Sequence, residues 1–402
     1  MKILVLDEFL CYPVDSGKKV RTYNLLRQLA ARHQITLLCF VWGDAREREG
    51  IDHLRSIGIE IVTISRGNPA KSGVAFYWKL FTNLFSRLPY IVAGHFSSAY
   101  RDRLAQLIAD KKPDLLLAEW SPYAVYLKEY SHIPRVAVAH NIESSIWRGY
   151  VEKSESRIRR TYVGLQYRKV VRFEHEIFGW LEGLITVSPV EQEQVQRDYP
   201  GLKVALVDNG VDTEYFAPSP SVREECLVSF TGSMDWRPNQ DGIEYFIRTI
   251  LPLLRAHVPE VTLLTIGRRP PEWLVALGKE HAVEFTGSVA DVRPDMRRTA
   301  VSIVPLRIGG GSRLKILEAF AMEKAVVSTA LGAEGLAVTP GKHLLIADDP
   351  QAFAGAVARL LRDPSERRRL GTAGRALVTE KYQWDRLAVS MSSFLEELVG
   401  AR

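Results

Sequence analysis

The residues best suited to chemistry lie between Gly309 and Glu318. Three glycines and Ser312 lead into a helical pattern of apolar residues, and Arg313 and Lys315 follow in its first turn. With Ser312 as the N-cap, the unpaired N–H groups and the dipole of that helix would attract an anion. Two cations at this end oppose the dipole, and a phosphate partner would explain them. A flexible loop with solvated charges is the alternative interpretation.

Glu318 stands about one helical turn beyond these cations, among apolar residues. A carboxylate in that position can accept hydrogen bonds from two hydroxyl groups, such as those of a ribose. Its alternative role is that of a helix carboxylate stabilised by the dipole. The segment is not a Walker A loop, because the required spacing of glycine, lysine and serine or threonine is absent.

Glycine also follows four short apolar runs in the second half of the chain, each at the point where the run ends. Glycine lets a backbone approach a ligand closely, since it has no side chain. If the runs are parallel strands, their ends meet at one edge of a sheet, where such sheets bind ligands. One glycine alone would indicate only a turn, whereas four favour a binding site. The residues concerned are Gly232, Gly267 with Arg268, Gly287, and the run Gly309, Gly310 and Gly311.

The first half of the chain has a matching arrangement. The apolar run 3–6 is followed by a loop and then by Gly17, which opens a helical pattern with Arg21 one turn in. His140 directly follows the run 135–139, so its imidazole would lie at a strand end and contact a polar ligand. Gly17 as a turn residue and His140 as a capping or core group are the alternatives. No second His or Cys stands at ligand spacing, so we expect no metal site.

The elements that must carry these residues alternate between short apolar runs and helical patterns. Many runs are rich in Val, Ile and Leu without polar alternation, which is typical of strands buried on both faces of a parallel sheet. The sequence therefore predicts two α/β domains with mostly parallel sheets. The expected strands are 3–6, 35–40, 59–64, 115–118, 135–139, 184–187 and 204–207, then 227–230, 261–266, 283–285, 301–304, 325–328 and 343–346. The expected helices of the second half are 240–256, 313–322, 350–362 and 364–380.

Composition excludes several classes of protein. The chain has 402 residues, of which 46% are hydrophobic and 25% charged, so it is neither disordered nor of low complexity. No run of about 18 apolar residues indicates a membrane span. Three scattered cysteines form no disulfide framework or metal spacing, which favours a reducing compartment. We therefore expect a cytoplasmic protein.

The net charge of +6 is unevenly distributed. Residues 1–205 hold 29 basic and 22 acidic groups, and residues 206–402 hold 24 and 25. Residues 157–172 concentrate six cations and no acid at helical spacing, which is typical of a helix that lies on an anionic membrane surface. A solvated helix face is the alternative. The cations are Arg157, Arg159, Arg160, Arg168, Lys169 and Arg172.

An aromatic segment, residues 76–85 with Trp78, is a second candidate for that membrane or acceptor surface. Core packing is its alternative interpretation. A nucleic-acid partner would also suit a basic helix. The mild overall charge argues against it, and the glycine-rich strand ends would stay unexplained.

Taken together, the motifs resemble those of glycosyltransferase family 4, a large retaining group with the GT-B fold of two Rossmann-like domains facing across a cleft. The resemblance spans nearly the whole chain, and its strength lies in the order and spacing of the pieces. They are residues 13–21, 187–188, 208–212, 230–234, 265–268, 285–287, Gly309 to Glu318, and 325–329. Residues 140–143, residues 237–239 and the glycine-rich run further resemble sugar transferases of exopolysaccharide and PEP-CTERM systems.

The resemblance implies a nucleotide-diphosphate sugar as donor, bound to the second domain, and a saccharide or lipid-linked acceptor on the first. It implies an acceptor domain at 1–207, a donor domain at 208–385 and a last helix, 386–402, that returns to the first domain. The mechanism that the resemblance implies uses no metal and no cofactor, since the donor, such as a UDP- or GDP-sugar, is itself a substrate. His140 matches the histidine that faces the transferred sugar, and Gly17 matches the donor-contacting first loop.

The chain departs from the family pattern at two places. The family binds its donor with two glutamates; Glu318 matches the second, which holds the ribose, and Gly310 stands in place of the first. We expect backbone N–H groups of the loop to replace that lost contact. The family also often has an arginine and a lysine after the first strand of the second domain, where this chain has Arg237 and no lysine. We expect Arg313 and Lys315 to hold the diphosphate instead, assisted by Arg237.

Loss of the first glutamate leaves two other interpretations open. The chain could be a GT-B protein that binds a sugar nucleotide with impaired catalysis, or an epimerase acting on one.

Overall fold

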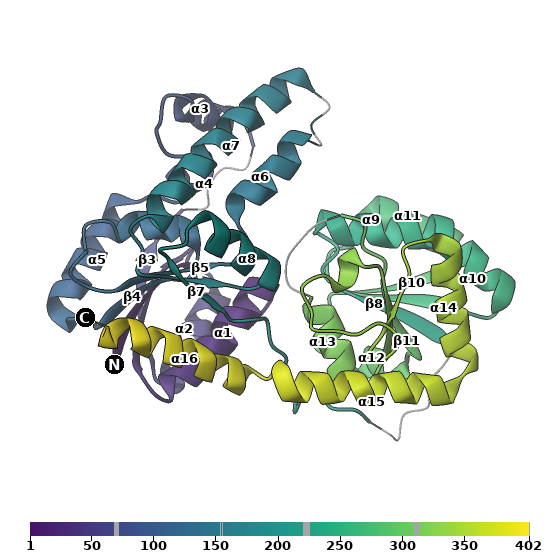
Figure 1. Cartoon of the computed structure of the whole chain (residues 1–402). Coiled ribbons are helices and arrows are strands. Elements are labelled where there is room, and N and C mark those ends of the chain that lie inside the picture. The colour runs from purple at the N-terminus through teal and green to yellow at the C-terminus, as the bar shows by residue number, and fades with distance from the viewer. Residues whose placement is uncertain (68–71, 153, 155, 220–225, 309–312, 402) are drawn as a thin grey trace. The chain divides into compact units, whose positions relative to one another are not determined.

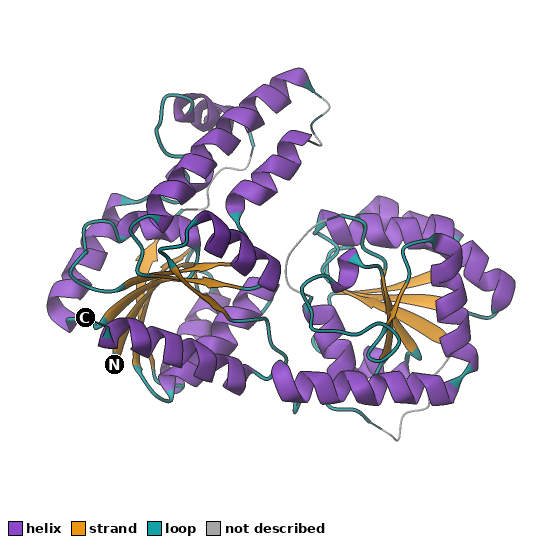
Figure 2. Ribbon diagram, in the orientation of Figure 1, coloured by secondary structure: helices purple, strands orange, loops and turns teal. Residues whose placement is uncertain are grey.

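The computed structural model describes residues 1–67, 72–152, 154, 156–219, 226–308 and 313–401. They form two compact domains (Figure 1). The first domain comprises Met1–Asp208 together with Leu387–Arg402, and the second comprises Asn209–Arg386. Each domain is built on its own parallel sheet, which helices cover on both faces (Figure 2).

The first domain has a parallel sheet in the order β3-β2-β1-β4-β5-β6-β7. Its strands are β1 (Lys2–Phe9), β2 (Gln34–Val41), β3 (Ile59–Ser65), β4 (Leu115–Ala118), β5 (Arg135–Ala139), β6 (Gly183–Thr186) and β7 (Lys203–Leu206). Its helices are α1 (Gly17–Ala30), α2 (Ala45–Ser56), α3 (Val74–Asn83), α4 (Tyr90–Ala93), α5 (Ser98–Lys111), α6 (Glu143–Glu152), α7 (Arg157–Phe178) and α8 (Pro189–Asp198), with a 3-10 helix at Ser121–Tyr126.

The second domain has a parallel sheet in the order β10-β9-β8-β11-β12-β13. Its strands are β8 (Leu227–Thr231), β9 (Thr262–Ile266), β10 (Val283–Gly287), β11 (Val301–Val304), β12 (Ala325–Ser328) and β13 (Leu345–Ile346). Its helices are α9 (Arg237–Tyr245), α10 (Leu251–His257), α11 (Glu272–Glu280), α12 (Arg293–Arg298), α13 (Leu314–Ala321), α14 (Pro350–Arg362) and α15 (Pro364–Lys381). A π-helical turn, Phe246–Ile250, joins α9 to α10, and Leu331–Ala333 is a 3-10 helix.

The apolar runs of the sequence become strands, as predicted. In β4, β5, β11 and β12 every residue is buried and the bounds coincide with the predicted ranges. These strands lack polar alternation because helices cover both faces of each sheet, so no side chain of theirs meets water. The last predicted strand, 343–346, is shorter than expected and comprises only Leu345–Ile346.

Both sheets wind outward from a central first strand. β1 pairs with β2 on one side and with β4 on the other, and β8 is paired in the same way with β9 and β11. At such a reversal the connections leave in opposite directions, and a crevice opens beyond the carboxyl ends of the two strands. The fold thus directs the residues that follow β1, β4, β8 and β11 toward ligand-binding positions.

The last helix, α16 (Trp384–Gly400), packs on the first domain from Leu387 onward. Ser392 Oγ lies 2.7 Å from His33 Nε2, and Lys203 Nζ donates to Glu397 Oε1 at 2.7 Å. Gly183 gives the helix room, because a Cβ there would stand 2.5 Å from Leu398 Cδ1. The chain therefore starts and ends in the same domain.

Two glycine backbones meet at the carboxyl ends of β8 and β9, where a Cβ on Gly267 would stand 1.9 Å from the carbonyl oxygen of Gly232. We expect Gly267→Ala to lower the free energy of unfolding by about 1–3 kcal/mol, because the backbones must move apart. Gly355→Ala is the matched control: it adds a methyl group to α14 in open space and should stabilise by roughly 0.5–1 kcal/mol. Equal unfolding curves for the two variants in urea would contradict the close approach.

Candidate active site

Lys315 is the central side chain of the second domain's site. It projects from the first turn of α13, and its Nζ donates to Asn239 Oδ1 at 2.8 Å and lies 3.9 Å from the centroid of the Phe230 ring. A Cβ on Gly232 would stand 3.0 Å from the same Nζ. The ammonium group therefore lies directly against the backbone that leaves β8. Burial first, and then the charge of Arg313, lower the pKa of Lys315 to about 7.

Asn239 fixes this arrangement from α9. Its side chain is buried, with Nδ2 donating to the carbonyl oxygen of Ser233 at 2.7 Å and Oδ1 accepting from Lys315. The amide is a neutral partner, so it orients the ammonium group without neutralising it. The sequence analysis did not include Asn239 in the site, although Arg237-Pro-Asn239 follows β8 at the carboxyl end of a strand.

Glu318 lies one turn after Lys315 on α13 and is half-buried. Burial raises the pKa of its carboxyl to about 7, while the charge of Lys315 acts in the opposite direction. A carboxylate and an ammonium group thus stand together at the edge of the sheet, each enclosed enough to have a strongly shifted pKa. Such paired, shifted groups in one place are typical of binding and catalytic sites.

Arg313 takes a different direction from Lys315. It occupies the N-cap position of α13, is buried, and lies 3.4 Å from Glu334 Oε2 through its NH2 group. Burial lowers the pKa of its guanidinium. Of Arg313 and Lys315, it is therefore Lys315 whose charged group lies against Gly232.

The other predicted donor residues lie around the same strand ends. Arg268, directly after Gly267, donates from Nε to Ser233 Oγ at 2.9 Å, and its NH2 lies 3.8 Å from Asp235 Oδ2. Arg237 begins α9 and is exposed. The predicted residues Gly309, Gly310, Gly311 and Ser312 lie outside the described residues.

In the first domain, buried charges gather where β1 and β4 end. Lys18 Nζ, near the start of α1 at Gly17, donates to Asp7 Oδ1 at 2.6 Å and lies 5.4 Å from the Trp120 ring centroid. Asp7 is buried in β1, and burial raises the pKa of its carboxyl. The lysine therefore has a carboxylate and an aromatic face as neighbours at the predicted crevice.

Glu119, directly after β4, is the functional candidate that the sequence analysis missed. It is buried, accepts from Thr22 Oγ1 at 2.9 Å, and has its pKa raised to about 7 by burial and by the charge of Asp7. Arg21 acts in the opposite direction on that pKa. Arg21 is itself buried and donates from NH1 to the carbonyl oxygen of Asp208 at 2.6 Å. The sequence feature that could have identified Glu119 is its position, since its carboxylate directly follows the apolar run 115–118.

His140 follows β5, and its imidazole turns toward Glu119 at the end of β4. Its Nε2 lies 2.8 Å from the carbonyl oxygen of Glu119, which can only accept, so Nε2 carries the proton and Nδ1 is left as an acceptor. Burial, and then the charges of Lys18 and Arg21, hold the pKa of His140 well below its usual range. The imidazole is therefore neutral and can accept a hydrogen bond from a hydroxyl group.

The predicted surface residues divide into two groups. Lys169 was predicted to lie on the surface, and this is wrong: its side chain is buried, and Nζ donates to the carbonyl oxygens of Asn83 at 2.6 Å and Leu84 at 3.2 Å. The face of α7 that carries Lys169 packs against the end of α3, which removes it from solvent. The residues that are exposed are Arg157, Arg159, Arg160, Arg168, Arg172 and Trp78.

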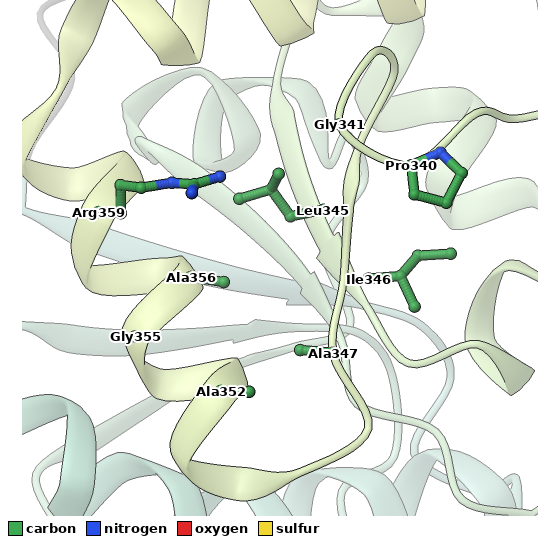
Figure 3. Close-up of a pocket in the computed structure, with 9 residues that line it drawn as sticks. All are labelled: Pro340, Gly341, Leu345, Ile346, Ala347, Ala352, Gly355, Ala356 and Arg359. Carbon is green, nitrogen blue, oxygen red and sulfur yellow. The ribbon is translucent and has the colours of Figure 1, made fainter.

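A pocket beside β13 and α14 contains none of the predicted site residues (Figure 3). Small and apolar side chains line it, and the one charged lining residue, Arg359, lies 3.0 Å from Glu366 Oε2. Within the described residues, no group of three or more His, Cys, Asp and Glu side chains could hold a metal ion. None of the described helices is long and apolar enough to cross a membrane.

Comparison with known proteins identifies the family of the chain. The profile described as "Glycosyltransferase Family 4" matches residues 16–215, and that described as "Glycosyl transferases group 1" matches residues 225–363. The two profiles follow the two domains. The chain belongs to glycosyltransferase family 4 and has the GT-B fold.

Two relatives illustrate the range of similarity. A GDP-mannose-dependent alpha-(1-6)-phosphatidylinositol monomannoside mannosyltransferase of Mycobacterium tuberculosis (strain ATCC 25618 / H37Rv) is 31% identical over 224 residues, covering 49% of this chain and 56% of the relative. The chain thus matches little more than half the length of that relative. An uncharacterized 44.6 kDa protein in the cps region of Klebsiella pneumoniae is 20% identical, with 95% of this chain and 96% of the relative covered.

Solved structures share the fold across the whole chain. Sucrose-phosphate synthase from Thermosynechococcus elongatus has a TM-score of 0.72 and 18% identity, covering 100% of both chains. Anabaena Alr3699/HepE in complex with UDP and glucose has a TM-score of 0.67 and 16% identity, covering 98% of this chain and 99% of that chain.

The buried carboxyl of Glu119 predicts a pH effect on stability. Its pKa is about 7 in the folded chain and 4.5 ordinarily, so between these values the folded chain keeps a proton that the unfolded chain has lost. Stability must then fall as pH rises through this window. We expect Glu119→Gln to gain stability relative to the wild type between pH 5 and 7.5, by up to about 3 kcal/mol.

Urea unfolding at both pH values measures this gain. Glu129→Gln is the control, because Glu129 is exposed. A Glu119→Gln difference from wild type that does not change with pH would contradict the shifted pKa.

Proposed function

We propose that this chain is a retaining glycosyltransferase that moves a sugar from a nucleotide-diphosphate sugar to an acceptor hydroxyl in polysaccharide or glycolipid assembly. The observation that carries the proposal is Lys315 held against Gly232 at the end of β8, with Glu318 one turn away. A diphosphate needs a cation and close backbone approach, and a ribose needs a hydroxyl acceptor.

The names of similar proteins support a sugar nucleotide as the donor. The Mycobacterium tuberculosis mannosyltransferase is named as GDP-mannose-dependent, and structures of Alr3699/HepE are in complex with UDP and with UDP-glucose. The base and the sugar differ among these proteins. The donor class is therefore proposed here as a nucleoside-diphosphate sugar without a choice of base.

The second domain would stabilise the departing diphosphate. Negative charge develops on the leaving phosphate oxygens as the glycosidic bond breaks, and an ammonium group already oriented by Asn239 stabilises that charge without having to reorganise. Glu318 would accept hydrogen bonds from the ribose hydroxyls and so fix the nucleotide's position. No metal ion is needed in this scheme, because Lys315 supplies the positive charge.

The first domain would hold the acceptor and the transferred sugar. His140 offers Nδ1 as a neutral acceptor for a sugar hydroxyl, while Nε2 is fixed on the carbonyl oxygen of Glu119. In a retaining transfer the attacking hydroxyl approaches the face that the diphosphate leaves, so a phosphate oxygen can take its proton. The protein then contributes orientation and charge.

We also propose that the chain works in the cytoplasm, at the inner face of the cytoplasmic membrane, with a lipid-linked saccharide as acceptor. The exposed arginines of α7 support this location, since clusters of exposed cations favour anionic lipid surfaces.

Substitution on α13 tests the donor site. We expect Lys315→Met and Glu318→Gln each to lower the rate of donor hydrolysis or transfer at least about tenfold, because each removes a contact to the nucleotide. Lys279→Met on α11 is the control, since Lys279 is exposed and should keep wild-type turnover. The assay uses UDP- and GDP-sugars, with thermal melting to verify folding. Wild-type turnover in both α13 variants would contradict the site.

A further inference from the structure

The outer face of α3 is apolar. Val74, Tyr77, Trp78, Phe81 and Phe85 are 88%, 67%, 64%, 50% and 80% exposed. Their spacing puts them on one side of the helix and its immediate continuation, where helical neighbours recur every three to four residues. Trp78 and Phe81 are in ring contact, with centroids 5.7 Å apart, as are Phe81 and Phe85 at 5.6 Å. Contiguous exposed apolar surface of this kind marks an interaction site.

Buried polar contacts hold α3 in this orientation. Gln166 of α7 donates from Nε2 to Asn83 Oδ1 at 2.8 Å and accepts from the backbone N–H of Tyr90 at 2.8 Å. Lys169 adds its two hydrogen bonds to the carbonyl oxygens of Asn83 and Leu84. Figure 1 shows α3 beside α7 in the first domain. The C-terminal end of α3 is thus fixed to the domain through Asn83 and Leu84, while its aromatic face stays exposed.

The charge around this face is positive. Residues 74–88 contain Lys79 and Arg87, both exposed, and no acidic residue. The exposed arginines of α7 include Arg168 and Arg172, which stand one turn apart. Aromatic side chains with flanking cations match the boundary of an anionic bilayer, where rings enter the headgroup region and cations meet phosphates.

We propose that the aromatic face of α3 inserts into the interface of an anionic lipid membrane, with the neighbouring cations on the lipid phosphates. A second copy of the chain is a poorer occupant, because a symmetric contact would bring together two faces that each carry Lys79 and Arg87 and no acidic residue. In this account Lys169 and Gln166 of α7 serve to orient α3, and α3 supplies the apolar contact.

This inference rests on the proposed function only in that a membrane would present the lipid-linked acceptor. Vesicle binding is measured without turnover, so the membrane proposal and the proposed function can fail separately. A wild type that binds vesicles but hydrolyses no donor would contradict the proposed function alone. A wild type that hydrolyses donor but ignores anionic vesicles would contradict the membrane site alone.

The test is co-sedimentation with vesicles of phosphatidylcholine, with and without roughly one third phosphatidylglycerol. We expect the wild type to bind the anionic vesicles, less strongly as salt rises. Trp78→Ser with Phe85→Ser should weaken binding at least about tenfold. Trp273→Ser is the matched control, an exposed tryptophan on α11 of the second domain, and should bind as the wild type does.

Thermal melting and nucleotide binding of each variant verify that it is folded. Binding of the double variant equal to that of the wild type would overturn the proposal. Vesicle binding weakened equally by Trp273→Ser would also overturn it. A third contradicting outcome is a lipid-free dimer of the wild type that the double variant no longer forms, while its vesicle binding stays unchanged.

Discussion

The candidate site depends on one electrostatic constraint, the half-buried ammonium group of Lys315, whose orienting hydrogen bond goes to the neutral amide of Asn239. Removing a charged amine from water is unfavourable, and the low pKa of Lys315 reflects that cost. Asn239 and the face of Phe230 orient the ammonium without cancelling its charge. A bound anion would offset this desolvation cost, so the feature that lowers stability in the free protein would favour binding of the proposed diphosphate.

The sheets supply the positions that this constraint needs. Because both sheets reverse their winding at the first strand, each domain collects polar groups where two strands end. In the second domain, Gly232 leaves space for Lys315 there. In the first domain, Asp7, Glu119 and His140 are brought together from three different strand ends. In neither domain are these residues contiguous in the sequence, and the sheet topology brings them together.

Much of the fold could be predicted from the sequence, because strands buried on both faces leave uninterrupted apolar runs and their carboxyl ends are marked by glycine or polar residues. Lys315 and Glu318 could be selected as candidate site residues from the chemistry of a helix N-terminus. Asn239 and Glu119 could not be ranked in that way, since their roles come from contacts across 76 and 97 residues of chain. Lys169 was misassigned because helical spacing shows that α7 is basic but not which face packs against α3.

The most direct test of the central claim is the proton balance of nucleotide binding. At pH 8 the free site holds Lys315 mostly neutral, and a bound diphosphate must raise the pKa of that amine. Calorimetric titration with UDP and GDP, in buffers of different ionisation enthalpy, should therefore reveal proton uptake by the wild type that Lys315→Met lacks, together with weaker binding. Equal affinity and equal proton uptake in the two proteins would contradict the account.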